Sequence, residues 1–178
     1  SPDESGSLLL LAARILFEGG DVAGARRLVG EARARFGPDA ESFVADRLEG
    51  EILLANNEVV AGERKLSELI EAGSGLEEEA AQAGVTLGGF AAGRGEWGSA
   101  ADAFGRVEAR YPLTEARVEA TIHRARILDD RLDGGGGARR SAAAALIEMA
   151  EVRPGSRRSQ LAEDGAAILL EETGAWGE

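Results

Sequence analysis

The sequence predicts an all-α protein made of consecutive helical hairpins that stack side by side as a solenoid. Three observations lead to this prediction. The chain is rich in Ala, Leu, Glu and Arg, which favour helices, and contains few β-branched residues. Its apolar residues recur at helical spacing, and that spacing returns at nearly regular intervals along the 178 residues.

One spacing pattern marks the second helix of each predicted hairpin. Apolar residues separated by alternating steps of three and four lie on one face of a helix. A set within residues 97–111 follows this pattern, and three further sets begin at Val22, Val59 and Arg139. The set at Arg139 has polar ends and is the weakest copy. With Trp176 opening a fifth set, the first positions are 37, 38, 42 and 37 residues apart.

Each set follows a Gly- or Asn-rich segment, and most are followed by Gly or Pro, which predicts turns at both ends. Another apolar-periodic segment precedes each turn. The predicted helices span residues 7–18, 22–36, 41–55, 59–72, 76–93, 97–111, 114–131, 138–153 and 157–173. Because the connections are short, neighbouring helices are expected to be antiparallel.

The predicted domain covers residues 7–178, after a flexible lead-in at 1–6. It contains about nine helices in four and a half repeats. The repeats are 7–38, 41–74, 76–112, 114–154 and a partial one at 157–178. The 42-residue interval includes four consecutive glycines at 134–137, which we interpret as an insertion in a turn.

The repeats resemble the tetratricopeptide repeat (TPR) family. The third unit fits best, with Leu87-Gly88 on its first helix, Gly95-Glu96-Trp97 at its turn, Ala100 and Phe104 on its second helix, and a closing Pro112. The resemblance covers nearly the whole chain and implies a right-handed α-α superhelix. It also implies a groove, lined by the first helices, that binds peptides or partner helices.

The repeat length exceeds the 34 residues usual for the family. The extra residues fall between repeats, for example around Tyr111-Pro112. This ending is similar to that of a bacterial envelope subclass, which includes the outer-membrane-assembly lipoproteins and the Tol-Pal-associated coordinator. The similarity implies a periplasmic or outer-membrane-associated location in preference to a cytoplasmic one.

Charge and composition exclude several function classes. The formal net charge is -12, whereas nucleic-acid binding requires a basic surface. There is no cysteine, and the longest uncharged run, residues 80–93, is too short to span a bilayer. We therefore expect protein partners, no nucleic acid and no direct insertion into a membrane.

The chemistry-bearing motifs do not support an enzyme. Residues 93–98 match the G-x-G-x-x-G pattern, but a helix and not a strand is predicted before them. The glycines at 134–137 lack the G-K-[ST] ending of a nucleotide-binding loop. His123 is the only histidine, and Trp97 and Trp176 occupy matching positions expected in the core. No cofactor, metal or catalytic site is expected.

The many glycines raise a separate question. Gly50 and Gly88 are expected where paired helices cross too closely for a side chain, since a helical glycine otherwise costs about 0.8–1.0 kcal/mol relative to Ala. For Gly30, Gly105 and Gly165 two interpretations stay open, close packing and a compositional bias toward glycine.

The family resemblance also implies which side chains line the groove. The candidates come from the first helix of each of the first four repeats. They are Leu10, Arg14, Phe17, Arg47, Glu51, Leu54, Val85, Gly89, Ala92, Ile122 and Arg126. Arginine pairs strongly with carboxylates, so an acidic or amphipathic segment is the expected ligand. The alternative is that the apolar candidates pack against neighbouring repeats.

The apolar face of the last predicted helix, which includes Leu161 and Leu169, has no following helix to cover it. A solenoid normally ends in a polar cap. We therefore expect the array to continue beyond this chain, or this face to meet a partner or a second copy. Together these patterns predict a protein-interaction scaffold within a larger assembly. The alternative is a helical accessory domain of a larger enzyme or regulator.

Overall fold

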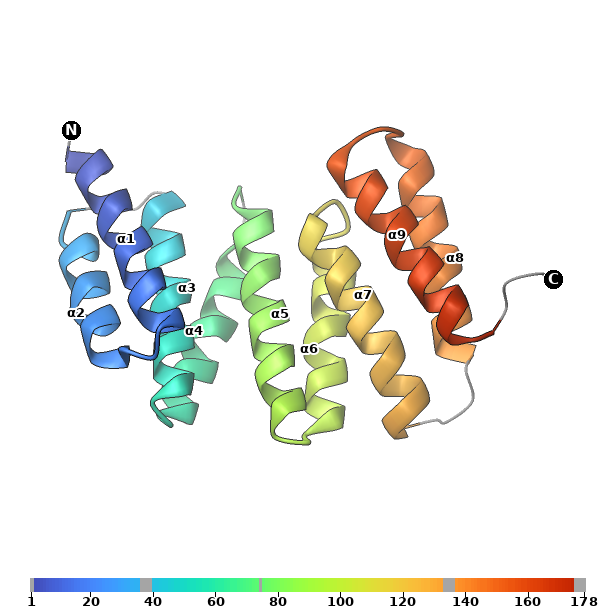
Figure 1. Ribbon diagram of the computed structural model, residues 1–178, viewed down its shortest axis with the longest axis horizontal. Coiled ribbons are helices and arrows are strands. Elements are labelled where there is room, and N and C mark those ends of the chain that lie inside the picture. Colours follow the sequence, from blue (N-terminus) through green and yellow to red (C-terminus); the bar gives the residue numbers. More distant parts are fainter. Residues whose placement is uncertain (1, 36–39, 74, 133–136, 175–178) are drawn as a thin grey trace. The chain divides into compact units, whose positions relative to one another are not determined.

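A computed structural model of the protein describes residues 2–35, 40–73, 75–132 and 137–174, and the regular structure within these ranges is helical throughout (Figure 1). The elements are α1 (Pro2–Glu18), α2 (Val22–Arg33), α3 (Ala40–Ala55), α4 (Val59–Ala72), α5 (Glu77–Gly93), α6 (Trp97–Arg110), α7 (Glu115–Ile127), the π-helix η1 (Leu128–Leu132), α8 (Gly137–Val152) and α9 (Arg157–Glu172). The predicted all-α class is confirmed, and the predicted helices correspond to α1–α9 in order.

Two boundaries differ from the prediction by four residues or more. Residues 2–6, which belong to the lead-in predicted at residues 1–6, form the start of α1, so this helix begins five residues before its predicted start. Proline is tolerated in a first helical turn, because the N–H that it lacks would have no intrahelical partner there. At the other difference, the helix predicted over 114–131 ends as an α-helix at Ile127 and continues as η1.

The chain separates into two compact units, residues 1–83 and 84–178, which are described in turn. The boundary falls within α5. The prediction of a single continuous repeat domain over 7–178 stays a prediction.

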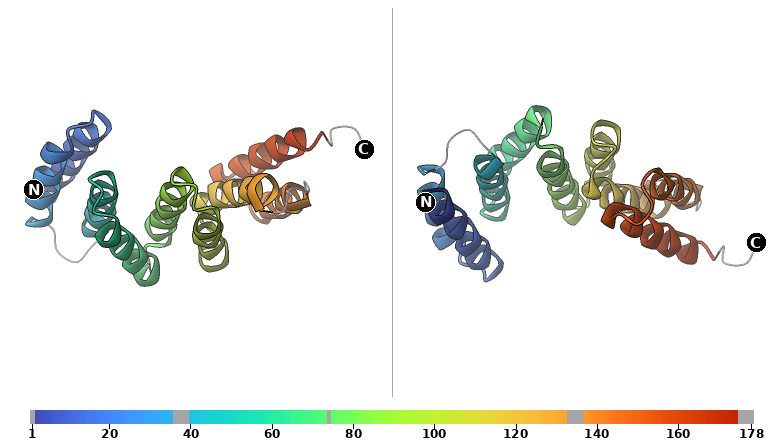
Figure 2. Two further views of the ribbon diagram at one scale, coloured as in Figure 1. Left: turned by 90° about the horizontal axis from the view of Figure 1, so that it is seen from below. Right: turned by 90° about the horizontal axis from the view of Figure 1, so that it is seen from above.

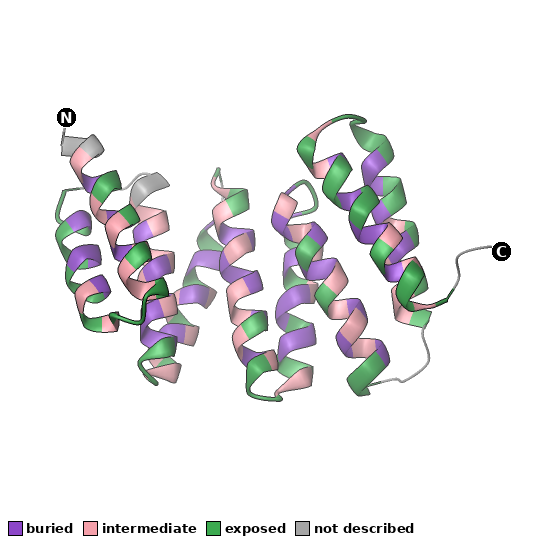
Figure 3. Cartoon of the chain, viewed as in Figure 1, coloured by how far each residue is buried: buried purple, intermediate pink, exposed green. Residues whose placement is uncertain are grey.

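The first unit contains two packed hairpins, α1–α2 and α3–α4, and α3 also contacts α2 and α1. The buried side chains include Val29 and Ala32 of α2 and Leu48 and Ile52 of α3. Figure 3 shows that buried positions recur along each helix and are interleaved with exposed ones, as expected for helices with one buried face.

The second unit is centred on α7, which packs against α6, α8 and α9 (Figure 2). Its core includes Leu146 and Met149 of α8 and Leu169 of α9, and Phe104 of α6 is only 1% exposed. Leu146 and Met149 belong to the weakest predicted repeat. Ala143 and Ala150 of the same helix are buried as well.

The first three hairpins share one turn geometry. Gly20, Asn57 and Gly95 adopt left-handed φ angles of 85°, 62° and 76°. In each turn the following acidic residue donates its N–H to a carbonyl five residues earlier, at 2.8, 2.9 and 3.0 Å. This arrangement is the Schellman motif, which satisfies the last carbonyls of a helix. The turn residues predicted from the sequence are therefore confirmed at these three places.

The connection from α7 to α8 has a different design. Asp129, on η1, is buried, and its carboxylate accepts hydrogen bonds from the N–H groups of Ala138 at 3.0 Å and Arg139 at 2.8 Å. It thereby satisfies two of the unpaired donors at the start of α8. Of the glycines predicted to form this turn, those at 134–136 lie outside the described residues, and Gly137 is the first residue of α8.

Close helix crossings explain three of the helical glycines. A Cβ placed on Gly50 or Gly88 would lie 2.7 Å from a leucine or phenylalanine side chain, which confirms the prediction for both. A Cβ on Gly165 would lie 2.8 Å from the Cδ1 atom of Ile122, so close packing explains this glycine too. Gly30, by contrast, has nothing within 4 Å of such an atom.

Candidate partner-binding groove

In the first unit, a pocket of about 330 Å³ opens between the first helices of the two hairpins. Its lining residues are Ser7, Leu10, Leu11 and Arg14 of α1 with Val44, Arg47 and Leu48 of α3. Leu10, Arg14 and Arg47 were predicted to line a groove, and the structure brings them together here. The place of this pocket between α1 and α3 matches the place that the family resemblance implies.

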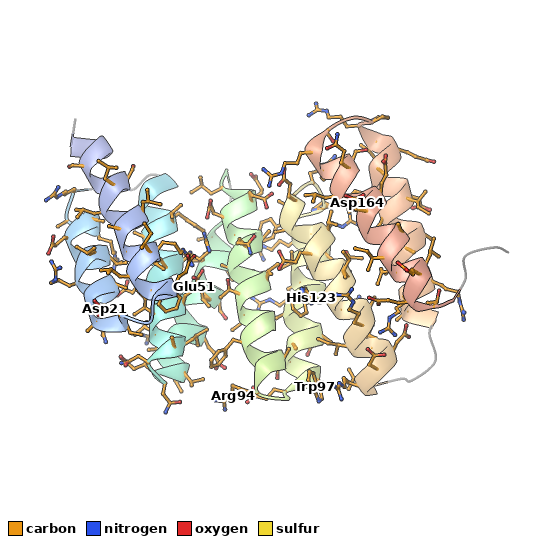
Figure 4. All side chains as sticks on the ribbon, in the orientation of Figure 1. Asp21, Glu51, Arg94, Trp97, His123 and Asp164 are labelled. Carbon is orange, nitrogen blue, oxygen red and sulfur yellow. The ribbon has the colours of Figure 1, made fainter. Side chains whose placement is uncertain are left out.

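Two arginines that line this pocket, Arg14 and Arg47, form salt bridges. Glu51 of α3, labelled in Figure 4, accepts hydrogen bonds from both Arg14 and Arg47, the latter at 2.7 Å from its Oε1 atom. Arg47 also donates through Nε to Glu79 of α5 at 3.2 Å. Only 10% of the Glu51 side chain is exposed, so this carboxylate serves the two arginines and not solvent. The charges of the pocket are therefore already paired within the protein.

An exposed apolar stripe on α1 adjoins this pocket, and one of its residues, Leu11, also lines the pocket. Leu8, Leu11 and Ile15 lie three and four residues apart on α1, and all three are exposed. Ser7, Leu11, Val44 and Leu48 were not among the predicted residues. For Ser7, Leu11 and Val44 the signal was helical spacing, because they lie seven or three residues from Arg14 or Arg47 on the same helices. Leu48 is adjacent to Arg47, so this spacing does not identify it.

Two other candidates of the first unit are packing residues. Leu54 is buried, and its side chain occupies the space that a Cβ on Gly62 would need. Phe17 is half-buried and packs against the core of the unit. For these two residues the structure supports the alternative interpretation, in which the apolar candidates stabilise the stack of helices.

The candidates of the second unit do not form one described pocket. Val85 is buried, Ala92 is half-buried and Gly89 is exposed. Ile122 packs against Gly165 and the core around it. Arg126 is held in an ion pair, so it resembles Arg14 and Arg47 in having its charge satisfied internally.

Arg126 belongs to an ion-pair cluster that ties the end of α9 to α7 and α8. Glu172 accepts hydrogen bonds from Arg126 and, at 3.0 Å, from Arg139, and Arg139 also donates to Asp130 at 2.6 Å. The hydrogen bond from Arg126 lowers the pKa of Glu172 below its ordinary value of 4.5, with a further contribution from Arg139. The hydrogen bond from Arg139 likewise lowers the pKa of Asp130, and these bonds raise the pKa of Arg139.

Two residues that the sequence singled out as candidates for chemistry, His123 and Trp97, make packing contacts with other side chains. His123 is exposed and stacks on the Phe104 ring, with 5.5 Å between ring centroids. Trp97 is half-buried and not a core residue, and the Arg131 guanidinium of η1 lies over its ring, 4.7 Å from the ring centroid. Both are labelled in Figure 4. Trp176 lies outside the described residues.

The part of the chain that the structure describes has neither a metal-binding cluster nor a membrane-spanning helix. It contains no group of three or more His, Cys, Asp or Glu side chains placed to hold a metal ion. None of its helices combines the length and the apolar composition needed to cross a membrane.

The protein consists of antiparallel helical hairpins. Their Schellman turns recur, and their helices cross closely at glycines, so the fold is a TPR-like helical-repeat fold. The chain is similar to a crystal structure of the nearly identical TPR-like repeats of a kinesin light chain from Podosopora anserina. The TM-score is 0.56 at 14% sequence identity, over 99% of this chain and 90% of that chain. No protein-family profile and no curated protein sequence matches the chain.

Proposed function

We propose that this chain is a protein-interaction scaffold whose first unit binds an amphipathic helical segment of a partner between α1 and α3. The observation that carries the proposal is the pocket of about 330 Å³ next to an exposed apolar stripe on α1, in the place where helical repeats of this type bind their ligands. The TPR-like fold supports the general role of a scaffold and a non-enzymatic function.

The chemistry of the pocket favours an apolar contact with the partner. Leu8, Leu11 and Ile15 present an exposed apolar stripe, which an amphipathic helix can cover with leucine-like side chains at the same spacing. Arg14 and Arg47 already pair with carboxylates of the protein. An acidic segment would have to displace those carboxylates before it gained the arginines, so a helix with one apolar face suits this pocket better.

The location within the cell also belongs to the proposal. The Tyr111-Pro112 repeat ending supports an assignment to the bacterial envelope-associated subclass, and therefore a periplasmic or outer-membrane-associated assembly. Tyr111 is buried, so the ending serves packing in this protein as well.

The proposal is tested by affinity capture from the native source, followed by mass spectrometry. Leu11→Arg places a charge in the apolar stripe and should abolish capture of proteins that the unaltered chain retains. Val60→Arg is the matched control, because Val60 is 82% exposed and lies on α4, away from the pocket. A set of captured proteins that is the same for both variants would contradict the proposed site. Failure to capture any protein specifically would contradict the scaffold role itself.

A further inference from the structure

The second unit contains a groove of its own, formed by α6, α7 and α8 with Leu128 of η1 and Arg158 of α9. Two adjoining pockets of about 310 and 220 Å³ share Arg117 and Ala145. One side of the groove is a stripe of small side chains on α8, spaced three or four residues apart. This stripe consists of Ala138, Ser141, Ala142 and Ala145. Small side chains leave room for the backbone of a ligand to approach the helix closely.

Three arginines line this groove, and the guanidinium of each donates one hydrogen bond to another described residue. Arg124 donates through Nη1 to Glu108 at 2.8 Å, while Arg117 and Arg158 each donate through Nη1 to a backbone carbonyl, at 2.9 and 2.6 Å. The Nε atom of each is shielded from solvent and has no acceptor among the described residues. Each of the three guanidinium groups therefore has donor capacity that no described residue uses.

These arginines differ from those of the first unit. Arg14 and Arg47 have their donors directed at Glu51 and Glu79, whereas the three groove arginines face only two carboxylates, Glu108 and Glu148, in the lining of the groove. The two units also differ in charge. Residues 1–83 contain 17 acidic and 8 basic side chains, and residues 84–178 contain 15 and 12. An anionic ligand is consequently repelled less by the second unit.

We propose that this groove binds an extended acidic segment of a partner protein. Carboxylates of the segment pair with Arg124 and Arg117, and an apolar side chain that follows them packs near Leu113 and Val152, two exposed residues at the other end. The part of α8 that lines the groove, from Ala138 to Val152, is about 21 Å long at the helical rise. About six extended residues span this length. This site is independent of the pocket proposed between α1 and α3.

The test uses the full chain and a fluorescein-labelled peptide of about eight residues, in which glutamate alternates with glycine before two leucines. Fluorescence anisotropy measures its dissociation constant. We expect binding that weakens as NaCl is raised from about 50 to about 500 mM, because the contacts are ionic. An otherwise identical peptide with glutamine in place of glutamate should bind at least about ten-fold more weakly, since charge-assisted hydrogen bonds are lost.

Two variants address the groove by different means. Arg117→Gln combined with Arg124→Gln removes the charges and should weaken binding of the glutamate peptide by roughly ten-fold or more. Ser141→Trp, at an exposed position, fills the groove while leaving every charge in place and should weaken binding to a similar extent. Arg157→Gln is the control, because Arg157 is 80% exposed, pairs with Glu115 and lies next to Arg158 in sequence. It should change binding less than about two-fold.

Nuclear magnetic resonance of the arginine Nε–Hε groups locates the ligand without relying on variants that fold poorly. The resonances of Arg117, Arg124 and Arg158 should shift on addition of the glutamate peptide, and that of Arg14 should not. The proposal is overturned if the glutamate peptide does not bind up to about 1 mM, or if the glutamine peptide binds equally well. Unchanged binding by both groove variants would overturn it too. A single-stranded oligouridylate that binds more tightly than the peptide would also do so, by showing that the groove recognises phosphates instead of carboxylates.

Discussion

Two adjacent glycines of α5, Gly88 and Gly89, have opposite surroundings. The Phe104 ring lies against Gly88, whereas the space around the position of a Cβ on Gly89 is empty to 4 Å. The buried ring cannot move away, because Phe104 is almost completely enclosed. One glycine is thus required by packing, and the other only lowers the helical propensity of α5.

We expect Gly88→Ala to lower the free energy of unfolding by roughly 1–3 kcal/mol, because the added methyl overpacks the core. Gly89→Ala, the matched control, should raise it by roughly 0.5–1 kcal/mol through better helix propensity. Urea unfolding followed by circular dichroism measures both. Equal effects of the two substitutions would show that α5 and α6 do not cross as closely as described.

Glu172 makes the stability of the second unit dependent on pH. Its pKa is lowered in the folded protein, so the stability that it contributes is present above about pH 4.5 and is lost as the pH falls through the lowered value. Glu172→Gln should therefore be less stable than the unaltered chain at pH 7, and the difference should shrink as the pH is lowered from 4.5 to about 3.

Thermal unfolding at several pH values measures this difference directly. Glu171→Gln is the control, because the neighbouring Glu171 is exposed and lies outside the cluster around Arg126 and Arg139. A difference between the Glu172 variant and the unaltered chain that stays constant from pH 7 to pH 3 would contradict the role of these ion pairs.

At the scale of elements, the three Schellman turns share one backbone geometry but differ in the residue at the left-handed position. Gly20 and Gly95 occupy the left-handed position in two of them, and Asn57 occupies it in the third. A side chain in this conformation is strained, although asparagine tolerates it better than most residues. The second turn is therefore the least relaxed of the three.

We expect Asn57→Gly to stabilise the protein by about 0.5 kcal/mol and Asn57→Ala to destabilise it by about 1 kcal/mol, because alanine bears the full strain. Ala55→Gly serves as a control: it places a glycine at an exposed position in the last turn of α3 and should cost up to about 1 kcal/mol. Melting temperatures of the variants rank them. An alanine variant as stable as the glycine variant would show that the turn does not need a left-handed residue.

Local patterns predicted most of the elements, because helical spacing and turn residues depend only on residues that are close together in the sequence. The exception is η1, where the backbone widens and Asp129 reaches forward to the start of α8. A carboxylate that caps a helix from another element depends on how the two elements meet. The sequence alone showed only that an insertion lay between Trp97 and Arg139.

The candidate groove was predictable only in part, for a similar reason. The positions of Leu10, Arg14 and Arg47 follow from helical spacing and the repeat register. That Glu51 would neutralise both arginines depends on the packing of α1 against α3, 37 residues away in sequence. Likewise, it could be recognised only once α6, α7 and α8 were placed together that the Nε atoms of Arg117 and Arg124 have no acceptor among the described residues.

At the scale of the whole molecule, each unit has a core of its own. Leu48 is almost fully buried in the first unit, and Leu146 is fully buried in the second. In helical-repeat proteins, stability is approximately a sum of contributions from repeats and their neighbours. A cavity in one unit should therefore weaken that unit most.

We expect Leu48→Ala and Leu146→Ala each to cost about 2–5 kcal/mol locally. Hydrogen exchange should show Leu48→Ala lowering protection chiefly in α1–α4, and Leu146→Ala chiefly in α7–α9. Each variant is the control for the other. Uniform loss of protection along the chain in both variants would instead show that the two units unfold as one cooperative body.

The shared turn has an evolutionary consequence. Each Schellman closure is formed by backbone atoms of a few consecutive residues, so it needs no help from distant parts of the chain. Duplication of a stretch of about 37 residues, the commonest interval here, would add a hairpin that contains all the residues of its own turn. An ancestral gene could lengthen in this way, leaving later substitutions to diversify the surfaces of the new copy.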